Sequence, residues 1–509
     1  MATRALETEL DRSRRLVIPE LVARSARRDP EAPALAFEGE RRSFGALEQR
    51  ANRLAAALAA RGVGAGDKVA ILMYNRIEFV ESFIAVQLLG ACAVPVNFRL
   101  SREEAEYVLA DSGSLLAIAD PELAPLAGEL PTLVVGEDYE QALAAAPAEP
   151  PAVAVDDEDL AFLMYTSGTT GRPKGAMLSH QNLLCNTTNW LYEVGARPGD
   201  VWLSGLPLFH IGGLNGVLPF LHLGSLAVIE PSGGFDPADS IARFVEHGVT
   251  MCFFVPTQWQ EICASPEVER IDRERLRVAM WGASQAPLPT LELMSRTFPS
   301  VEIVSAFGQT EMSSNTCFLK GEDSIRKMGS VGKPALGVEV RIVDEDGADV
   351  PQGEVGEIVY RGPTVMHGYH QRPEATAEAF AGGWLHSGDL VREDEEGFIY
   401  VVDRLKDMLI SGGENVYPAE VERALVSHPG VAEVAVIGVP HERWVETPLA
   451  VVVREAGAEV GEEELIELCR ERLAGYKKPS AVVFVDDLPR NASGKVLKRT
   501  LRERYASPD

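Results

Sequence analysis

Apolar residues recur along this chain in two patterns that alternate with each other. Residues 44–62, FGALEQRANRLAAALAARG, place apolar side chains three or four positions apart and end at a glycine, which predicts an amphipathic helix. The next segment, KVAILM at 68–73, is a short unbroken apolar run typical of a buried strand. The same order from helix to strand returns at 79–97 and at 240–257. Because strands that alternate with helices form mostly parallel sheets covered on both faces, the pattern predicts an α/β fold of stacked αβ layers.

The pattern changes after residue 330. Residues 338–362, VEVRIVDEDGADVPQGEVGEIVYRG, alternate apolar and polar positions around Asp-Gly and Gly-Glu turns, which predicts a small antiparallel sheet or β-barrel. Beyond it, a helix from Ala419 to Ser427 precedes two strand-like runs, EVAVIGVP at 433–440 and PLAVVVRE at 448–455. With 509 residues the chain exceeds the size at which one hydrophobic core keeps growing. We therefore expect a large N-terminal domain that includes the small β-barrel, and a separate small α+β C-terminal domain.

Charge and cysteine content narrow the class of protein. The formal net charge of -28 argues against general binding of nucleic acid or anionic membranes, although residues 470–509 carry ten Lys or Arg against five Asp or Glu. That basic tail either meets an anionic ligand or is a solvated helix surface. The six cysteines form no C-x-x-C pair, and His367 and His370 lack neighbouring ligands that would indicate zinc. Since no leader or membrane-spanning apolar run is visible, we expect a soluble, cytoplasmic protein with reduced thiols.

A loop rich in glycine and hydroxyl residues, YTSGTTGRPKG at 165–175, carries the clearest chemical signal. Its glycines let backbone N–H groups turn toward a phosphate, and its hydroxyls and lysine add donors and charge. The spacing is not that of a P-loop, since Gly168 is followed by Gly171 and Lys174, and neither Ser nor Thr follows that lysine. The alternative is a flexible surface linker, which is disfavoured because the loop directly follows the strand-like run DLAFLMY at 159–165.

Five motifs in order connect this loop to a known family. They are YTSGTTGRPKGAMLSH at 165–180, SAFGQTEM at 305–312, WLHSGDL at 384–390, VVDRLKDMLISGGENVYPAEVE at 401–422 and PRNASGKVLKRTL at 489–501. Together they resemble the signature motifs of the adenylate-forming superfamily, which includes acyl-CoA synthetases, nonribosomal peptide adenylation domains and luciferases. Within that group the chain looks most like the fatty-acid and aryl-acid CoA ligases. The resemblance implies an N-terminal adenylation domain at 1–404 and a mobile C-terminal domain at 405–509.

The chemistry implied by the resemblance has two steps and uses ATP, Mg²⁺ and CoA. A carboxylate oxygen attacks the α-phosphorus of ATP to give an acyl-adenylate and pyrophosphate, and the CoA thiol then displaces AMP. Charge along the phosphates must be neutralised for the first step. The β- and γ-phosphates are assigned to the glycine-rich loop, through Thr166, Ser167, Gly168, Thr169, Thr170 and Lys174.

The remaining motifs supply the other implied roles. The adenine side is assigned to Gly282, Ala283, Ser284, Phe307 and Gln309. Thr310 is assigned to the α-phosphate and Glu311 to Mg²⁺, since a hard cation prefers carboxylate oxygen. Asp389 and Arg404 are assigned to the ribose. Lys495 is the expected catalytic lysine of adenylation, Lys406 the expected hinge, and Gly412 and Gly413 would line the pantetheine channel.

The acid substrate is expected to be mainly hydrophobic. In relatives the acyl pocket is lined by the segment that corresponds to LFHIGGLNGVLPF at 208–220. Its glycines would leave space, and its apolar walls would be Leu214, Val217, Leu218 and Phe220. His210 either faces the carboxylate as a catalytic residue or is a hydrogen-bonded core histidine, and Trp259 and Trp281 either cap the pocket or are core aromatics. We expect a medium or long-chain fatty acid first, and an aryl acid such as a cinnamate second.

Three other functions remain open at the level of sequence. In the first, the enzyme transfers the acyl group to a carrier protein in place of CoA. In the second, GASQA at 282–286 is a nucleophile elbow with Ser284 as a hydrolase nucleophile, although the final glycine of that motif is absent. The third is a non-catalytic binding protein, against which Lys495, Glu311 and Asp389 argue. The expected partners are the acid, ATP and CoA, and the expected oligomeric state is a monomer or homodimer.

Overall fold

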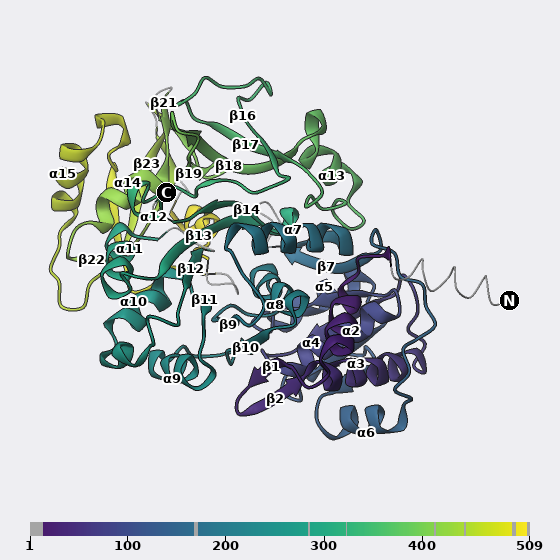
Figure 1. Cartoon of the computed structure of the whole chain (residues 1–509). Coiled ribbons are helices and arrows are strands. Elements are labelled where there is room, and N and C mark those ends of the chain that lie inside the picture. Colours follow the sequence, from purple (N-terminus) through teal and green to yellow (C-terminus); the bar gives the residue numbers. More distant parts are fainter. Residues whose placement is uncertain are drawn as a thin grey trace. The chain divides into compact units, whose positions relative to one another are not determined.

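The computed structural model describes residues 14–166, 172–282, 286–321, 323–411, 414–441, 444–490 and 495–505 (Figure 1). The chain divides into two compact units. One consists of Met1–Val340 and Tyr360–Leu385, and the other of Arg341–Val359 and His386–Asp509. The expected domain boundary between residues 404 and 405 concerns where the chain would hinge, and it stays a prediction.

The N-terminal unit contains a six-stranded sheet in the order β6-β5-β3-β4-β7-β8. The strands are β3 (Lys68–Leu72), β4 (Cys92–Pro95), β5 (Leu116–Ala119), β6 (Thr132–Val134), β7 (Leu160–Thr166) and β8 (Lys174–Ser179). The β3 strand pairs in parallel with β4 and β5, and β4 pairs in parallel with β7, whereas β7 and β8 form an antiparallel hairpin. The strand predicted at 68–73 is therefore confirmed as β3.

A nine-stranded sheet in the same unit has the order β15-β14-β13-β12-β11-β9-β10-β1-β2. The strands are β1 (Pro33–Phe37), β2 (Glu40–Ser43), β9 (Val201–Ser204), β10 (Leu226–Ile229), β11 (Met251–Phe253), β12 (Val278–Gly282), β13 (Glu302–Gln309), β14 (Ser314–Leu319) and β15 (Lys333–Pro334). The strands from β1 to β13 in this order are parallel. Antiparallel strands finish the sheet at both ends, β2 at one and β14 with β15 at the other.

Helices cover both sheets of the N-terminal unit. They are α2 (Ile18–Arg28), α3 (Phe44–Ala59), α4 (Ile77–Leu88), α5 (Arg102–Ser112), α6 (Glu137–Ala145), α7 (His180–Glu193), α8 (Ile211–Leu223), α9 (Pro237–His247), α10 (Pro256–Ala264), α11 (Leu288–Thr297), α12 (Asp323–Arg326) and α13 (Pro373–Ala379). The α4 helix contacts β3 and β4 of one sheet and β1 of the other, and α7 contacts β8 and β14. These helices therefore lie between the sheets, which explains why α4 is apolar and buried over nearly its whole length.

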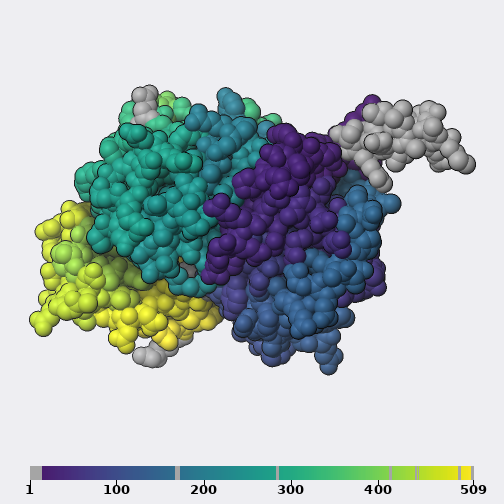
Figure 2. Space-filling view, turned by 60° about the horizontal axis from the view of Figure 1, so that its bottom comes forward, coloured from purple at the N-terminus to yellow at the C-terminus, as the bar shows by residue number. Residues whose placement is uncertain are grey.

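Local sequence signals account for where the predicted helices begin and end. For example, α9 begins after Asp236, whose carboxylate accepts from the Ala238 N–H, and ends at Gly248, which has the left-handed φ of 60°. The helices predicted within 44–62, 79–97 and 240–257 are confirmed as α3, α4 and α9, and each precedes its expected strand. Figure 2 shows α2 and α3 at the surface, in purple, beside the blue segment that includes α6, against which α3 packs.

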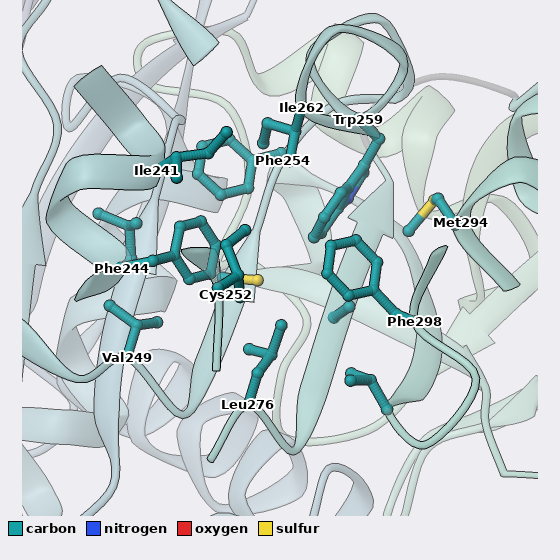
Figure 3. Close-up of a cluster of buried hydrophobic side chains, with 14 of the residues drawn as sticks. Ile241, Phe244, Val249, Cys252, Phe254, Trp259, Ile262, Leu276, Met294 and Phe298 are labelled. Atoms are coloured by element: carbon teal, nitrogen blue, oxygen red, sulfur yellow. The ribbon is translucent and has the colours of Figure 1, made fainter. Parts of the chain in front are cut away.

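An aromatic core covers one face of the nine-stranded sheet (Figure 3). Phe244 stacks on Phe254, whose ring meets the edge of Trp259, and Trp259 in turn contacts Phe298. The indole N–H of Trp259 donates to the Met280 carbonyl at 2.8 Å, so the polar group of this side chain has a hydrogen-bond partner inside the core. Trp259, like Trp281, therefore belongs to the core cluster, which supports the second of the two expectations for these tryptophans.

Two further sheets lie mostly in the C-terminal unit. Of the small sheet or β-barrel expected here, the structure has the sheet. Its four strands have the order β16-β17-β18-β19, formed by β16 (Glu339–Val343), β17 (Gly356–Arg361), β18 (Leu385–Glu393) and β19 (Ile399–Arg404). A five-stranded sheet follows, with β20 (Leu409–Ser411), β21 (Glu414–Val416), β22 (Val431–His441), β23 (Val445–Arg454) and β24 (Ala481–Val485). Its helices are α14 (Pro418–Val426), α15 (Glu462–Arg472) and α16 (Lys498–Tyr505).

The predicted α/β class and α+β C-terminal part are confirmed by these elements. The helix expected at Ala419–Ser427 is α14, and the two strand-like runs after it are β22 and β23. Among the residues that the structure describes, no helix is long and apolar enough to cross a membrane.

Candidate active site

The glycine-rich loop joins two paired strands of the six-stranded sheet. Thr166 at the end of β7 pairs with Lys174 at the start of β8, so the hairpin brings both ends of the loop together. A Cβ on Gly175 would lie 2.8 Å from Leu163 Cδ1, so close packing favours glycine at this position of the motif. The assignments of Ser167, Gly168, Thr169 and Thr170 lie outside the described residues.

A polar cluster fastens the base of this loop to α5. Tyr107 donates its hydroxyl to the Pro173 carbonyl at 3.0 Å, and Tyr165 donates to Asp111 Oδ2 at 2.8 Å. Asp111 also forms an ion pair with Arg372, whose guanidinium donates to the Tyr107 hydroxyl at 3.2 Å. Both limbs of the loop are therefore tied to the same helix, which limits their separation.

Thr310 and Glu311 lie on a tight turn between two strands of the other sheet. The β13 strand ends at Gln309, a short 3-10 helix spans Thr310–Met312, and β14 returns antiparallel. A Cβ on Gly308 would lie 1.8 Å from the Ser314 carbonyl oxygen, so only glycine fits this turn. Ser313 and Ser314 have φ angles of 59° and 111°. Such backbone strain in non-glycine residues is typical of functional sites.

The α7 helix supports the turn that carries Glu311. Asn186 donates its amide to the Met312 carbonyl at 3.2 Å and to the Asn315 carbonyl at 2.8 Å. Its amide oxygen accepts from Asn215 on α8 at 2.8 Å. This buried amide was not among the predicted site residues, because the turn that it supports lies more than a hundred positions away in the sequence.

Tyr369 joins the loop lysine to the predicted metal carboxylate. Its hydroxyl donates to Glu311 Oε1 at 2.9 Å, and Lys174 Nζ lies 4.9 Å from the centroid of its ring. Burial, and then the charge of Glu311, raises the pKa of Tyr369, so the hydroxyl stays protonated and remains a donor. The structure thus brings together Lys174 and Glu311, which were predicted, through Tyr369, which was not. No spacing in the sequence indicates this contact.

The geometry around Glu311 suits Mg²⁺. This ion is commonly held by one or two carboxylates together with substrate phosphates and water. Among the described residues no group of three or more His, Cys, Asp or Glu forms a self-sufficient metal cage. A single carboxylate oriented by a tyrosine and placed near the loop lysine fits an ion that reaches the site with a nucleotide.

The predicted adenine-side residues lie at the carboxyl ends of two neighbouring parallel strands. Gly282 at the end of β12 pairs with Ala306, next to Phe307 on β13. A Cβ on Gly282 would lie 2.3 Å from the Ala306 carbonyl oxygen, so the two strands require glycine there. Gln309 Nε2 is buried without a hydrogen-bond partner among the described residues. Ligands of α/β sheets commonly bind at this end of the strands, whereas Ala283 and Ser284 lie outside the described residues.

His210 is the N-cap residue of α8. Its Nδ1 accepts from the Gly212 N–H at 3.3 Å, and the residue is half-buried. The loop before it is held by Asn75, whose amide donates to the Leu206 carbonyl at 3.2 Å and accepts from the Leu208 N–H at 2.7 Å. His210 therefore has a structural task, and its catalytic assignment stays a prediction.

The apolar residues of α8 are buried, and their assignment to an acyl pocket stays a prediction. A Cβ on Gly213 would lie 2.1 Å from the Pro207 carbonyl oxygen, so the space this glycine leaves is taken by backbone. Phe220 is fully buried, stacks on Trp202 with a centroid separation of 5.3 Å and meets the edge of Trp190. These contacts belong to the protein core. The expected pocket walls Leu214, Val217 and Leu218 are likewise buried.

The C-terminal unit brings the two predicted ribose residues together. Asp389 on β18 is cross-strand partner of Arg404 on β19, and their side chains form an ion pair at 2.5 Å. Lys495 is exposed and precedes the bridge between Arg490 and Val496.

Lys406 lies among several other charged side chains of the C-terminal unit. The pKa of Lys406 is lowered, first by partial desolvation and then by repulsion from Arg404, Lys495 and Arg502, while Asp407 opposes the shift. This cluster of cations suits a polyanionic ligand. Gly412 and Gly413 lie outside the described residues.

Comparison with known proteins identifies the family. The model of the AMP-binding enzyme family matches residues 22–370, and that of the AMP-binding enzyme C-terminal domain matches residues 420–495. The chain belongs to the AMP-binding enzymes. A feruloyl-CoA synthase from Amycolatopsis is 44% identical, over 95% of this chain and 98% of the relative. A long-chain-fatty-acid–CoA ligase, FadD13, from Mycobacterium tuberculosis is 37% identical, over 92% of this chain and 94% of the relative.

Solved structures agree with this family assignment. The o-succinylbenzoate CoA synthetase from Bacillus subtilis, in complex with an acyl-adenylate intermediate, superposes with a TM-score of 0.87 at 37% identity, over 95% of this chain and 97% of that one. The same enzyme has been solved with ATP and magnesium ion. This AMP-binding enzyme is thus an acid–thiol ligase of the AMP-forming type, with ATP, Mg²⁺ and CoA as its cofactor and co-substrates. The hydrolase and non-catalytic alternatives find no support.

Proposed function

We propose that Lys174, Thr310 and Glu311 bind the triphosphate of Mg-ATP in the N-terminal unit. This proposal rests on the contact of Tyr369 with both Lys174 and Glu311, which lie next to strands of different sheets. Glu311 would hold Mg²⁺, which neutralises phosphate charge when bound. Lys174 and the glycine-rich loop would hold the β- and γ-phosphates, and Thr310 would donate to the α-phosphate. Phe307, Gln309 and Gly282 would border the adenine.

The C-terminal unit would supply the ribose contacts and the catalytic lysine. Asp389, held by Arg404, would accept hydrogen bonds from the ribose hydroxyls. Lys495 would place its ammonium group between the carboxylate substrate and the α-phosphate, where it offsets the repulsion between two anions. We further propose that the chain hinges at Lys406, so that residues 405–509 exchange roles between adenylation and thioester formation. Gly412 and Gly413 would then border the pantetheine arm of CoA.

For the acid we propose an aromatic carboxylate of the hydroxycinnamate class. The feruloyl-CoA synthases matched here are 44% identical to this chain, compared with 37% for the fatty-acid ligase. The packing of α8 supports the same choice, because Phe220, one of the apolar residues expected to accommodate an alkyl chain, packs against Trp190 and Trp202. This reverses the order of preference that the sequence alone favoured.

A fatty acid is the second candidate, because the long-chain-fatty-acid–CoA ligase aligns with 92% of this chain. The enzyme would act in the cytoplasm, in keeping with its free cysteines, which are mostly buried. It would be a monomer or a homodimer. Transfer to a carrier protein remains the alternative to transfer to CoA.

A matched pair of acids tests the substrate class. Cinnamate and nonanoate have the same number of carbon atoms and differ in the aromatic ring and its conjugated double bond. Purified protein with Mg-ATP and CoA is assayed with each acid, and with ferulate, benzoate and palmitate, while AMP and thioester are measured separately. We expect kcat/KM for cinnamate and ferulate to exceed that for nonanoate by at least about tenfold, a ratio that binding-pocket differences commonly produce.

The two products separate the remaining outcomes. AMP and thioester that rise together establish transfer to CoA, whereas AMP without thioester indicates a carrier protein as the acceptor. A preference for nonanoate and palmitate would overturn the aromatic assignment in favour of a fatty acid. Absence of AMP with every acid would contradict the proposed substrate classes altogether.

A further inference from the structure

Tyr369 contacts both charged groups of the proposed triphosphate site. Lys174 begins β8 of the six-stranded sheet, and Glu311 follows β13 of the nine-stranded sheet. The Tyr369 hydroxyl donates to Glu311 Oε1 at 2.9 Å, and the Lys174 ammonium lies 4.9 Å from the ring centroid. A residue outside all five motifs therefore contacts both groups.

The backbone on both sides of Tyr369 is fixed. Tyr369 forms an antiparallel bridge with Ala176, and the His370 N–H donates to the Gly175 carbonyl at 2.8 Å. Its own N–H donates to Thr376 Oγ1 at 2.9 Å. Gly368, with a φ of 135°, approaches Thr376 so closely that a Cβ would lie 2.7 Å from the Thr376 methyl group. The backbone of Tyr369 is therefore held in place by several hydrogen bonds.

We propose that Tyr369 is a positioning residue that fixes the Mg²⁺ carboxylate and the phosphate-loop lysine relative to each other. This rests on the proposed function, because it takes Glu311 as a metal ligand and Lys174 as a phosphate ligand. A hydrogen bond to one carboxylate oxygen orients the group and directs its remaining lone pairs to the metal. The ring face attracts the ammonium group without using its N–H donors, which stay available to the phosphates.

Tyr369→Phe separates the two contacts, since it removes the hydroxyl and keeps the ring. Binding is measured with Mn²⁺, which is detected by EPR, in the presence of α,β-methylene ATP, which resists cleavage at the α-phosphate. We expect Y369F to weaken Mn²⁺ binding about tenfold or more, the usual effect of losing a hydrogen bond to a metal ligand. Calorimetry of the ATP analogue without metal should give the wild-type affinity, because the ring still faces Lys174.

Tyr369→Leu removes both contacts. It should weaken Mn²⁺ binding as Y369F does, and should also weaken metal-free binding of the analogue about threefold or more, as expected for a lost cation–π contact. Tyr192 is the matched control, because it is exposed and has Lys320 Nζ 5.8 Å from its ring centroid. Y192F and Y192L should change neither affinity.

A double-mutant cycle distinguishes positioning from general damage. Glu311→Gln should weaken Mn²⁺ binding by itself, and Y369F should add no further loss in that background, because its effect passes through the carboxylate. The proposal would be overturned if Y369F caused the same loss of Mn²⁺ affinity in the wild-type and the E311Q backgrounds. It would also be overturned if E311Q weakened Mn²⁺ binding and Y369F did not. An unchanged Mn²⁺ affinity of E311Q would overturn the metal assignment itself, and so the proposed function at this residue.

Discussion

His180 is a buried histidine that cannot take up a proton without loss of stability. It begins α7, is only 1% exposed, and its Nδ1 accepts from the Ile18 N–H at 3.2 Å. Burial lowers its pKa from 6.5 to about 3. The unfolded chain binds a proton near pH 6.5, whereas the folded chain does not. The contribution of this neutral histidine is therefore fully present above pH 6.5 and is lost progressively as the pH falls toward 3.

We expect His180→Asn to flatten the pH dependence of stability. In the wild type this residue should remove about 1.4 kcal/mol of unfolding free energy for each pH unit below its unfolded pKa. Urea denaturation at pH 7, 6 and 5 gives the slope for each protein, and the lower absolute stability of H180N does not affect the comparison. Parallel slopes for wild type and H180N would contradict the prediction.

Single residues also show which parts of the candidate site could be predicted from the sequence. Lys174 and Glu311 were predicted because each lies in a motif whose residue types suit phosphate and metal chemistry. Tyr369 was not, because its role arises from a bridge to Ala176, almost two hundred positions earlier. Local spacing cannot reveal a contact that the fold alone creates.

At the scale of elements, the turn between β13 and β14 depends on one glycine. We expect Gly308→Ala to cost about 1–3 kcal/mol of stability, the usual cost of overpacking, because the new Cβ would lie 1.8 Å from the Ser314 carbonyl oxygen. Relief of that clash would move Thr310 and Glu311. The rate of acyl-adenylate formation should therefore fall far more than the lower stability alone would cause. Pyrophosphate release and thermal unfolding measure the two effects.

Gly64→Ala provides the control for this substitution. Its Cβ would meet only Asp67 Oδ2, at 3.9 Å, so both activity and melting temperature should stay close to the wild type. Wild-type adenylation in G308A would show that the turn does not position Thr310 and Glu311.

Helix α8 carries the residues that were expected to line the acyl pocket. Its residues were expected to form pocket walls because they are apolar and correspond to the segment that lines the acyl pocket in relatives. A helix that is apolar on all sides is, however, typically covered on all sides. The α8 helix packs against α2 and α7 and against strands of the nine-stranded sheet, so Phe220 and its neighbours are enclosed by protein. The absence of a polar face was the signal that favoured a core helix.

For the whole molecule, the two half-reactions provide a test of the proposed division of labour. We expect Lys495→Ala to reduce acyl-adenylate formation by about a hundredfold or more, since it removes a charge that stabilises the transition state. Thioester formation from supplied acyl-adenylate should stay within about threefold of the wild type, because the lysine has no role in the attack of the thiol. Single-turnover assays of each half-reaction measure the two rates.

Lys478→Ala is a suitable control, because this lysine lies in the same basic segment and outside every motif. It should leave both half-reactions unchanged. Equal losses of both half-reactions in K495A would contradict the assignment of Lys495 to adenylation alone.

The segment that carries Tyr369 also affects how the molecule meets other copies of itself. β8 is the last strand of its sheet, and an open edge of this kind is a template for intermolecular strand pairing. Backbone hydrogen bonds from Met177 to Gly368 and from His367 to Met177, each 2.9 Å, cover that edge. Substitutions that loosen this segment to improve turnover would therefore uncover an aggregation-prone strand, so solubility and catalysis are constrained by the same few residues.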